Sequence, residues 1–243
     1  MNLIIDAGNT RTKVAVFNQK RILFENTFQP TVSLKDIQQI LTVHPCAWAM
    51  VSSVSNTTIA TQLKNHTQLK VIQLTSETPV PFRNEYGTPK TLGVDRIALA
   101  AAAFYEFPNQ NTLIIDAGTC ITYDFLNAQG AYKGGAISPG LQMRYAALNH
   151  YTAKLPLIKK EKLPTQLIGD STENSILSGV YLGIVNEIEG TIAKYQSLFQ
   201  HLTVILTGGD SQILSKTLKN TIFANPKFLI QGLNHILEYN KHE

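Results

Sequence analysis

Residues Leu3–Gly8 read LIIDAG, and residues Leu113–Gly118 repeat the same six letters. Each copy is an apolar run that ends in an aspartate and a glycine and is followed closely by threonines. Apolar runs rich in isoleucine and closed by a glycine turn predict buried β-strands. Because one copy stands at the start of each half of the 243-residue chain, the repeat predicts a duplicated α/β fold in which both lobes open with the same strand.

The segments that follow each copy support this duplication. Each copy leads into two further strands with short polar breaks, which indicate antiparallel hairpins, and then into alternating helices and strands, which indicate parallel crossovers. We therefore expect mixed sheets in two lobes, residues 1–110 and 111–243. The predicted strands are 2–8, 12–18, 21–28, 47–53, 69–74, 112–118, 120–127, 131–138, 202–209 and 221–229. The predicted helices are 33–41, 56–65 (capped by Asn56), 94–107, 141–151, 171–199 (capped by Asp170 or Ser171), 210–218 and 232–240.

Composition narrows the class of protein. The chain is 44% hydrophobic and 16% charged with a net charge of +4, which is typical of a globular protein and predicts no nucleic-acid partner. No apolar run spans a membrane without a polar break, and the N-terminus has no signal-peptide pattern, so we expect a cytoplasmic protein without membrane contact. Neither the two cysteines nor the six histidines have metal-ligand spacing.

The turn after the first copy has the composition of a phosphate-binding loop. Gly8 allows a tight turn, while hydroxyl and amide side chains and Lys13 supply donors and a positive charge, which suit phosphate oxygens. Asp6 would hold Mg²⁺ beside them. A plain hairpin with a polar turn is the alternative. The candidate loop comprises Asp6, Ala7, Gly8, Asn9, Thr10, Arg11, Thr12 and Lys13.

Two elements of the second half extend this pattern. Asp116 ends its strand as Asp6 does, and Gly118 and Thr119 form the turn. The predicted strand 202–209 ends in two adjacent glycines, Gly208 and Gly209, which would let the backbone approach a nucleotide. The chain contains neither the P-loop motif nor the dinucleotide-binding glycine motif after a strand, so neither of those routes to nucleotide binding is open. The two aspartate turns, one per lobe, predict phosphate loops on opposite sides of one cleft.

The motifs in this order resemble the actin/hexokinase superfamily, and in detail they resemble type III pantothenate kinases. The resemblance spans nearly the whole chain and rests on DAGNTRTK (6–13), YGTPKTLGVDR (86–96), DAGTCITYD (116–124), GGAISPG (134–140) and GDSTENSI (169–176). It implies a two-lobed, duplicated ribonuclease H-like fold. It also implies ATP-dependent phosphorylation of pantothenate, the first step of coenzyme A biosynthesis.

The resemblance assigns roles to the substrate side of the site. Asp95 would be the general base that takes the proton from the pantothenate hydroxyl as it attacks the γ-phosphate of ATP. From the residues alone, Asp95 could not be distinguished from Asp116 as the base, and a helix-capping role for Asp95 was equally open. The pantothenate-binding residues implied by the family are Tyr86, Gly93, Val94, Asp95, Arg96 and Thr172.

The resemblance also assigns the cofactor side. Asp6–Lys13 and Thr119 would bind ATP with Mg²⁺, and Asp116 would bind a monovalent cation, K⁺ or NH₄⁺. A homodimer is implied, and Gly179 and Gly183 on one predicted helix could pack either a partner's helix or a helix of the same lobe. The alternatives are another small-molecule kinase of the superfamily and a non-catalytic, nucleotide-binding transcriptional accessory factor.

Overall fold

The computed structural model describes residues 1–8, 11–29, 31–53, 58–159, 162–164, 166–220 and 222–241. Its contacts divide the chain into two compact units. The first comprises Met1–Pro108, Gly130–Tyr132 and Lys227–Glu243, and the second comprises Asn109–Gln129 and Lys133–Pro226. This division runs close to the expected boundary at residue 110 but groups the C-terminal helix with the first unit. Where the two lobes of the fold begin and end stays a prediction.

The first unit is built on a five-stranded sheet in the order β3-β2-β1-β4-β5. β1 pairs antiparallel with β2, and β2 pairs antiparallel with β3, whereas β4 and β5 run parallel to β1. The predicted combination of hairpins and parallel crossovers is confirmed here. The strands are β1 (Asn2–Ala7), β2 (Thr12–Asn18), β3 (Arg21–Phe28), β4 (Trp48–Ser53) and β5 (Lys70–Gln73).

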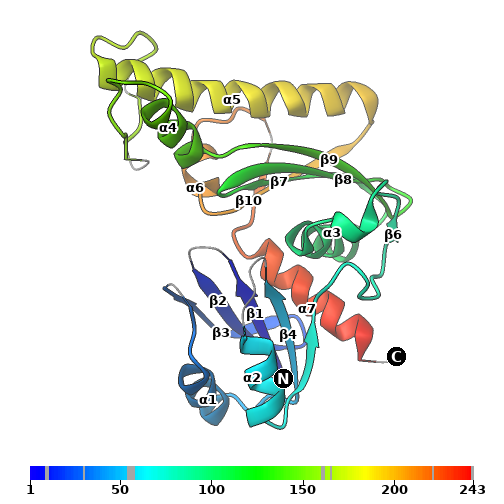
Figure 1. The fold of residues 1–243 in the computed structure, drawn as a ribbon. Helices are drawn as coiled ribbons and strands as arrows, with labels where there is room; N and C mark the ends of the chain where they lie inside the picture. The colour runs from blue at the N-terminus through cyan, green and yellow to red at the C-terminus, as the bar shows by residue number, and fades with distance from the viewer. Residues whose placement is uncertain are drawn as a thin grey trace. The chain divides into compact units, whose positions relative to one another are not determined.

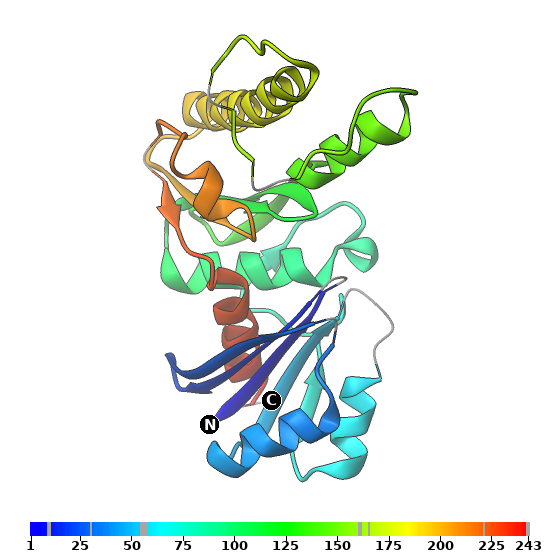
Figure 2. The same ribbon diagram turned by 90° about the vertical axis from the view of Figure 1, so that its left-hand side faces the viewer.

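Helices cover both faces of this sheet, as Figures 1 and 2 show. α1 (Leu34–Val43) and α2 (Ile59–His66) pack on the face that carries Leu3 and Ile5 of β1. α7 (Phe228–Asn240) lies against β1 and β4 on the other face and packs along α3 (Val94–Glu106). Because side chains alternate along a strand, Asp6 points to the same face as Ile4, away from α1 and α2.

The second unit repeats this plan with its own sheet. The strand order is β11-β10-β7-β8-β9, with β7 antiparallel to β8 and parallel to β10. One face carries a core in which Leu113 and Ile115 of β7 pack with Ile184 and Ile188 of α5. The elements are β7 (Asn111–Ala117), β8 (Cys120–Leu126), β9 (Ala131–Pro139), α4 (Leu141–His150), α5 (Thr172–Leu198), β10 (Leu202–Thr207), α6 (Ser211–Leu214) and β11 (Phe223–Ala224).

The elements differ from the prediction mainly where they are short. The helix predicted over 210–218 is confined to α6, the strand predicted over 221–229 is confined to β11, and α7 starts before the predicted residue 232. β6 (Arg83–Asn84), which pairs with residues 131–132 of β9, and the 3₁₀ turn η1 (Pro89–Thr91) were not predicted. Ser171 caps α5, whereas the predicted cap Asn56 lies outside the described residues. Within the part of the chain that the structure describes, no helix is both long and apolar enough to cross a membrane.

Candidate functional site

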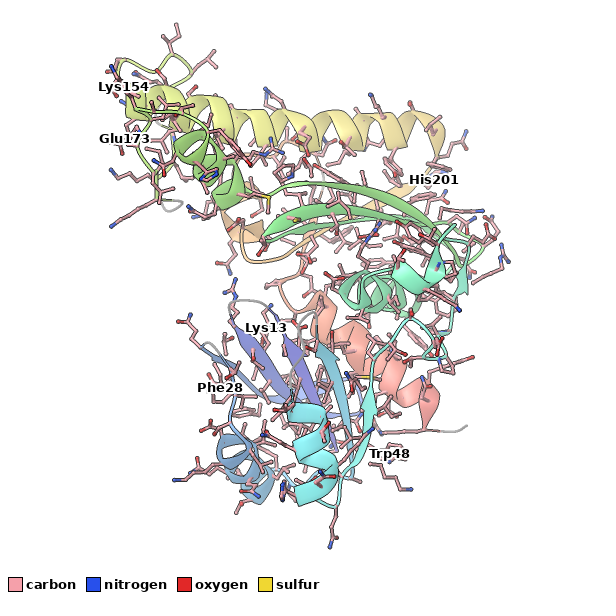
Figure 3. The ribbon with its side chains drawn as sticks, viewed as in Figure 1. Lys13, Phe28, Trp48, Lys154, Glu173 and His201 are labelled. Carbon is pink, nitrogen blue, oxygen red and sulfur yellow. The ribbon has the colours of Figure 1, made fainter. Side chains whose placement is uncertain are left out.

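Asp6 stands at the end of β1, where the strand gives way to the predicted phosphate loop. Lys13 of β2 and Ser52 of β4 are its register partners on the two neighbouring strands. The amide of Gly8 donates to the carbonyl of Arg11 at 3.1 Å, which closes a tight turn between β1 and β2. Lys13, labelled in Figure 3, lies at the end of the sheet where β1 stops. The pairing of β1 with β2 therefore brings a carboxylate and a lysine to one end of the sheet, next to the turn.

The electrostatics of Asp6 set it apart from the surface carboxylates. Burial raises the pKa of Asp6 to about 6, Lys13 and Ser52 lower it in part, and the negative charge of Asp95 raises it further. A carboxylate buried without full compensation is costly unless a ligand with positive charge binds it. Asp6 is therefore suited to a cation or to a metal-bound phosphate, and its coupling to Asp95 brings two acidic groups of the first unit into one electrostatic environment.

Asp95 lies in the first turn of α3, and the chain around it fixes its carboxylate. Gly93 caps the helix, and the Asp95 Oδ1 atom accepts a hydrogen bond from the Arg96 amide at 2.8 Å. A Cβ atom on Gly93 would lie 2.5 Å from the same Oδ1 atom, so any other residue here would force the carboxylate to leave this position. The N-terminal end of a helix stabilises a negative charge. Asp95 is thus held as a half-buried, ionisable acceptor.

Arg96 and Tyr86 meet beside Asp95. The Arg96 guanidinium lies over the Tyr86 ring, 5.4 Å from the ring centre, and Arg96 is only 5% exposed. Tyr86 also packs on the ring of Tyr132, at 6.2 Å between centres. Val94, between Gly93 and Asp95, is the first residue of α3. The structure thus places two of the predicted substrate residues, the Tyr86 ring and the Arg96 cation, in contact with each other beside Asp95.

Asp116 ends β7 in the second unit as Asp6 ends β1 in the first. The amide of Gly118 donates to the Cys120 carbonyl at 2.9 Å, and the Asp210 amide donates to the Ala117 carbonyl at 3.0 Å. Gly208, with a φ of +92°, comes so close that an added Cβ would lie 2.4 Å from the Asp116 Oδ1 atom. Gly208, the first of the two glycines predicted after β10, therefore lets the backbone approach the Asp116 turn, which explains why this position needs glycine.

The remaining predicted residues are distributed over both units. In the first unit, Ala7 and Thr12 are buried and Arg11 is exposed, while Asn9 and Thr10 lie outside the described residues. In the second unit, Thr119 is exposed in the Asp116 turn, and Thr172 is exposed as the first residue of α5.

Sequence reasoning missed two residues that touch these groups. Ser52 is fully buried beside Asp6 and lowers the pKa of that carboxyl. Tyr132 is fully buried behind Tyr86. The signal for Ser52 was the serine at the end of the apolar run 48–51, where parallel pairing with β1 sets it opposite Asp6. No local pattern pointed to Tyr132.

The donor set fits ATP-bound Mg²⁺ better than a cation held by protein ligands alone. Within the described ranges, no three His, Cys, Asp or Glu side chains cluster as a metal site. Mg²⁺ is commonly bound by one or two carboxylates together with substrate phosphates, which matches a single carboxylate at a phosphate turn. The carboxylate of Asp116 lies against the backbone of Gly208 and offers oxygen donors in the second unit.

Comparison with known proteins decides the family. The family model described as type III pantothenate kinase matches residues 2–194. The type III pantothenate kinase of Christiangramia forsetii is 51% identical over 243 residues, with 99% of each chain covered. That of Flavobacterium johnsoniae is 49% identical over 98% of each chain. The chain belongs to the type III pantothenate kinase family. A type III pantothenate kinase is an ATP-dependent phosphotransferase, so the predicted enzyme class is confirmed.

Solved structures show the fold that the sequence predicts. A Campylobacter jejuni protein assigned to the Baf family of transcriptional activators has a TM-score of 0.64 at 21% identity, covering 99% of this chain and 100% of that one. A ROK hexokinase from Thermus thermophilus has a TM-score of 0.52 at 12% identity, covering 99% of both chains. The predicted mixed α/β fold of the actin/hexokinase type is confirmed.

Proposed function

We propose that this chain transfers the γ-phosphoryl group of ATP to the primary hydroxyl of pantothenate and that Asp95 accepts the hydroxyl proton. The observation that carries this proposal is that the charge of Asp95 raises the pKa of Asp6. This electrostatic coupling indicates that the proposed base lies near the carboxylate that would hold the metal-bound phosphates. In phosphoryl transfer most of the catalysis is positioning and charge stabilisation. An ionised carboxylate at a helix start suits the proton acceptor in such a reaction.

The loop that begins at Asp6 would bind the phosphates. The tight turn at Gly8 stands beside Asp6, and Lys13 supplies a positive charge opposite that carboxylate. Asp6 itself would hold the Mg²⁺ ion of the nucleotide, directly or through water. The ion would supply positive charge to the transferred group, and Lys13 would help to orient that group. Binding of the cation would also relieve the cost of the buried Asp6 charge.

The residues around Asp95 would bind pantothenate. The Arg96 guanidinium is a fixed cation that can pair with the pantothenate carboxylate, and the Tyr86 ring offers an apolar wall to its dimethyl group. Tyr132 supports that wall from behind. Thr172, at the exposed start of α5, would contribute a further hydroxyl. Cation, aromatic ring and base would together favour an anionic, branched hydroxy acid over a sugar.

Asp116 would bind the monovalent cation, K⁺ or NH₄⁺. Its carboxylate shares the turn with the carbonyls of Ala117 and Gly118, and Thr119 in that turn would contact ATP. Carbonyl oxygens around one carboxylate are suited to a weakly hydrated monovalent ion, which does not need the charge that a divalent ion needs. We therefore expect activity in K⁺ or NH₄⁺ buffers and loss of activity in Na⁺ buffer or in Asp116→Asn.

We further infer that the protein is a homodimer in the cytoplasm. On α5, an added Cβ at Gly179 or at Gly183 would meet no atom of the described residues within 4 Å. The close packing that two glycines four residues apart permit is therefore not used by any described helix of the chain. A second copy is the occupant that the family resemblance implies.

The experiment is ATP-dependent product formation, followed by mass spectrometry of the phosphorylated acceptor. Pantothenate, N-acetylmannosamine, glucose and acetate are offered in parallel with Mg²⁺ and K⁺. We expect phosphopantothenate and at most trace products from the others. Nucleotide binding without turnover on any acceptor would instead favour the accessory-factor alternative, and turnover on another acceptor would favour a different kinase.

A further inference from the structure

The turn between β9 and α4 packs directly on the Asp116 turn, residues 116–119, which we propose contacts ATP through Thr119. The Gly140 amide donates to the Thr119 carbonyl at 3.1 Å. A Cβ at position 140 would lie 2.3 Å from the Gly118 carbonyl oxygen and 2.4 Å from that of Thr119, so the two backbones touch. Any shift of the β9–α4 turn is therefore transmitted to the loop that carries Thr119.

One side chain, Arg144, holds this turn in place from the first turns of α4. Its Nε atom donates to the Pro139 carbonyl at 2.8 Å, and its Nη2 atom donates to the Ser138 hydroxyl at 3.0 Å. The same Nη2 atom pairs with Glu187 Oε2 of α5 at 2.5 Å. The planar guanidinium thus ties the last two residues of β9 to α5, a set of directions that a lysine cannot reproduce.

Glu187 completes the arrangement from the other side. Its Oε1 atom accepts a hydrogen bond from the Tyr123 hydroxyl of β8 at 2.8 Å. Burial alone would raise the pKa of Glu187, but hydrogen bonds from Arg144, Tyr123 and Ser138 bring it below its usual value. Burial and the neighbouring Glu187 charge raise the pKa of Tyr123, so its proton stays on the phenol and is donated. Only 21% of the Arg144 side chain and 29% of the Glu187 side chain are exposed, so solvent screens this pair less than a surface pair.

We propose that Arg144 and Glu187 are positioning residues for ATP: they clamp the β9–α4 turn and, through Gly140, fix the loop that carries Thr119. Neither side chain contacts the reacting atoms. The inference rests on the proposed function only for the identity of the nucleotide, because Thr119 is the residue through which the clamp would act. Support behind a binding loop decides how well the loop is preorganised. Loosening the clamp should therefore weaken nucleotide binding while leaving pantothenate binding intact.

The test compares Glu187→Gln and Arg144→Lys with the wild type. The first keeps the shape of the side chain and removes its charge, and the second keeps the charge and removes the planar fork. We expect the Kd for Mg-ADP, measured by calorimetry, and the KM for ATP to rise roughly tenfold in both, since small displacements of a positioned group have effects of this order. The KM for pantothenate should stay within about twofold, because the clamp touches neither Tyr86, Asp95 nor Arg96, and Thr172 lies at the far end of α5 from Glu187. The thermal transition of each variant checks that the fold is retained.

A matched control removes a different ion pair. Glu25→Gln removes the charge that pairs with Lys227 at 2.6 Å. This pair belongs to neither the β9–α4 turn nor the Asp116 turn, so both KM values and the ADP Kd should stay unchanged. An unchanged ADP Kd in both clamp variants, or an equal rise in the KM for ATP and for pantothenate, would overturn the clamp. If the wild type binds ADP but does not phosphorylate pantothenate, the proposed function fails, while the calorimetric comparison still decides the clamp. If Glu187→Gln does not fold, Tyr123→Phe weakens the clamp more gently and must show a smaller rise of the same kind.

Discussion

At the residue scale, Asp6 combines burial with a raised pKa, and this makes its charge a cost to the folded protein. Its pKa rises from 3.8 to about 6, so between these values the folded state holds a proton that the unfolded state has lost. Stability from this group is full below pH 4 and is lost as the pH rises through about 6. We expect Asp6→Asn to be more stable than the wild type at pH 8 and equal to it at pH 4, as measured by urea denaturation.

A second aspartate provides the control with the opposite sign. The Ser33 hydroxyl and amide, which hydrogen-bond to Asp36 in the capping box of α1, hold the pKa of Asp36 below its usual value. Its ionised form therefore stabilises the fold above the unfolded pKa. Asp36→Asn should be less stable than the wild type at pH 8, and the difference should shrink as the pH falls below 4. Parallel pH dependence in the two variants would contradict the assignment of a buried, destabilised charge to Asp6.

A side chain added at Gly93 would directly disturb the carboxylate of Asp95, the proposed base. A Cβ there would lie 2.5 Å from Asp95 Oδ1, and that carboxylate can rotate away. Gly93→Ala should therefore fold with near wild-type stability and lose about 10²-fold in kcat, the effect expected of a misplaced catalytic group. Steady-state kinetics and a thermal melt on the same sample decide the matter. Full activity in this variant would mean that the position of the Asp95 carboxylate is not critical.

At the element scale, α3 and α7 are packed unusually close by small residues. A Cβ on Gly232 of α7 would lie 1.9 Å from the Ala98 carbonyl oxygen of α3, and residues 97–103 of α3 are almost completely buried. Gly232→Ala would push α7 away from α3, the helix that carries Asp95. Overpacking of this kind costs about 1–3 kcal/mol. We expect a loss of that size in the free energy of unfolding. Gly190→Ala in α5, where a Cβ meets nothing within 4 Å of the described residues, should instead stabilise by up to about 1 kcal/mol.

The sequence predicts long elements well because their patterns are local. β1, β2, β7 and β8 follow from the apolar runs and glycine turns, and α3 follows from its alanines. β6, with two residues, exists only because residues 131–132 lie beside it, and α6 and β11 are shorter than their apolar patterns predict. Their extents depend on tertiary pairing, which a single sequence does not carry.

At the scale of the whole molecule, the proposed dimer depends on the uncovered glycines of α5. Leucine at position 183 would block a close helix contact, while it raises helix propensity relative to glycine. By size-exclusion chromatography with light scattering, we expect the wild type at twice 26.9 kDa and Gly183→Leu at 26.9 kDa. Ala193→Leu, on an exposed position of the same helix, should remain dimeric. A wild-type monomer, or a dimeric Gly183→Leu, would contradict the assignment of this face.

The site could be predicted only in part, for a physical reason. The repeated LIIDAG located Asp6 and Asp116, because a carboxylate at the end of a buried strand is visible in a local pattern. The roles of Asp95 and Asp116 could not be separated from the residues alone. One aspartate was predicted at the start of a helix and the other at the end of a strand, and either position suits a base. The contact of Tyr86 with Tyr132 and the position of Ser52 beside Asp6 join segments far apart in the chain, and only the fold brings them together.

The central claim is that Asp95 is the base for phosphoryl transfer to pantothenate. The most direct test measures turnover and binding together for Asp95→Asn in K⁺ buffer with Mg²⁺. We expect kcat to fall by about 10²–10⁴-fold, the usual contribution of general base catalysis, while the Kd values for ADP and pantothenate stay within about threefold. A variant that retains kcat, or one that loses turnover only because it no longer binds pantothenate, would contradict that claim.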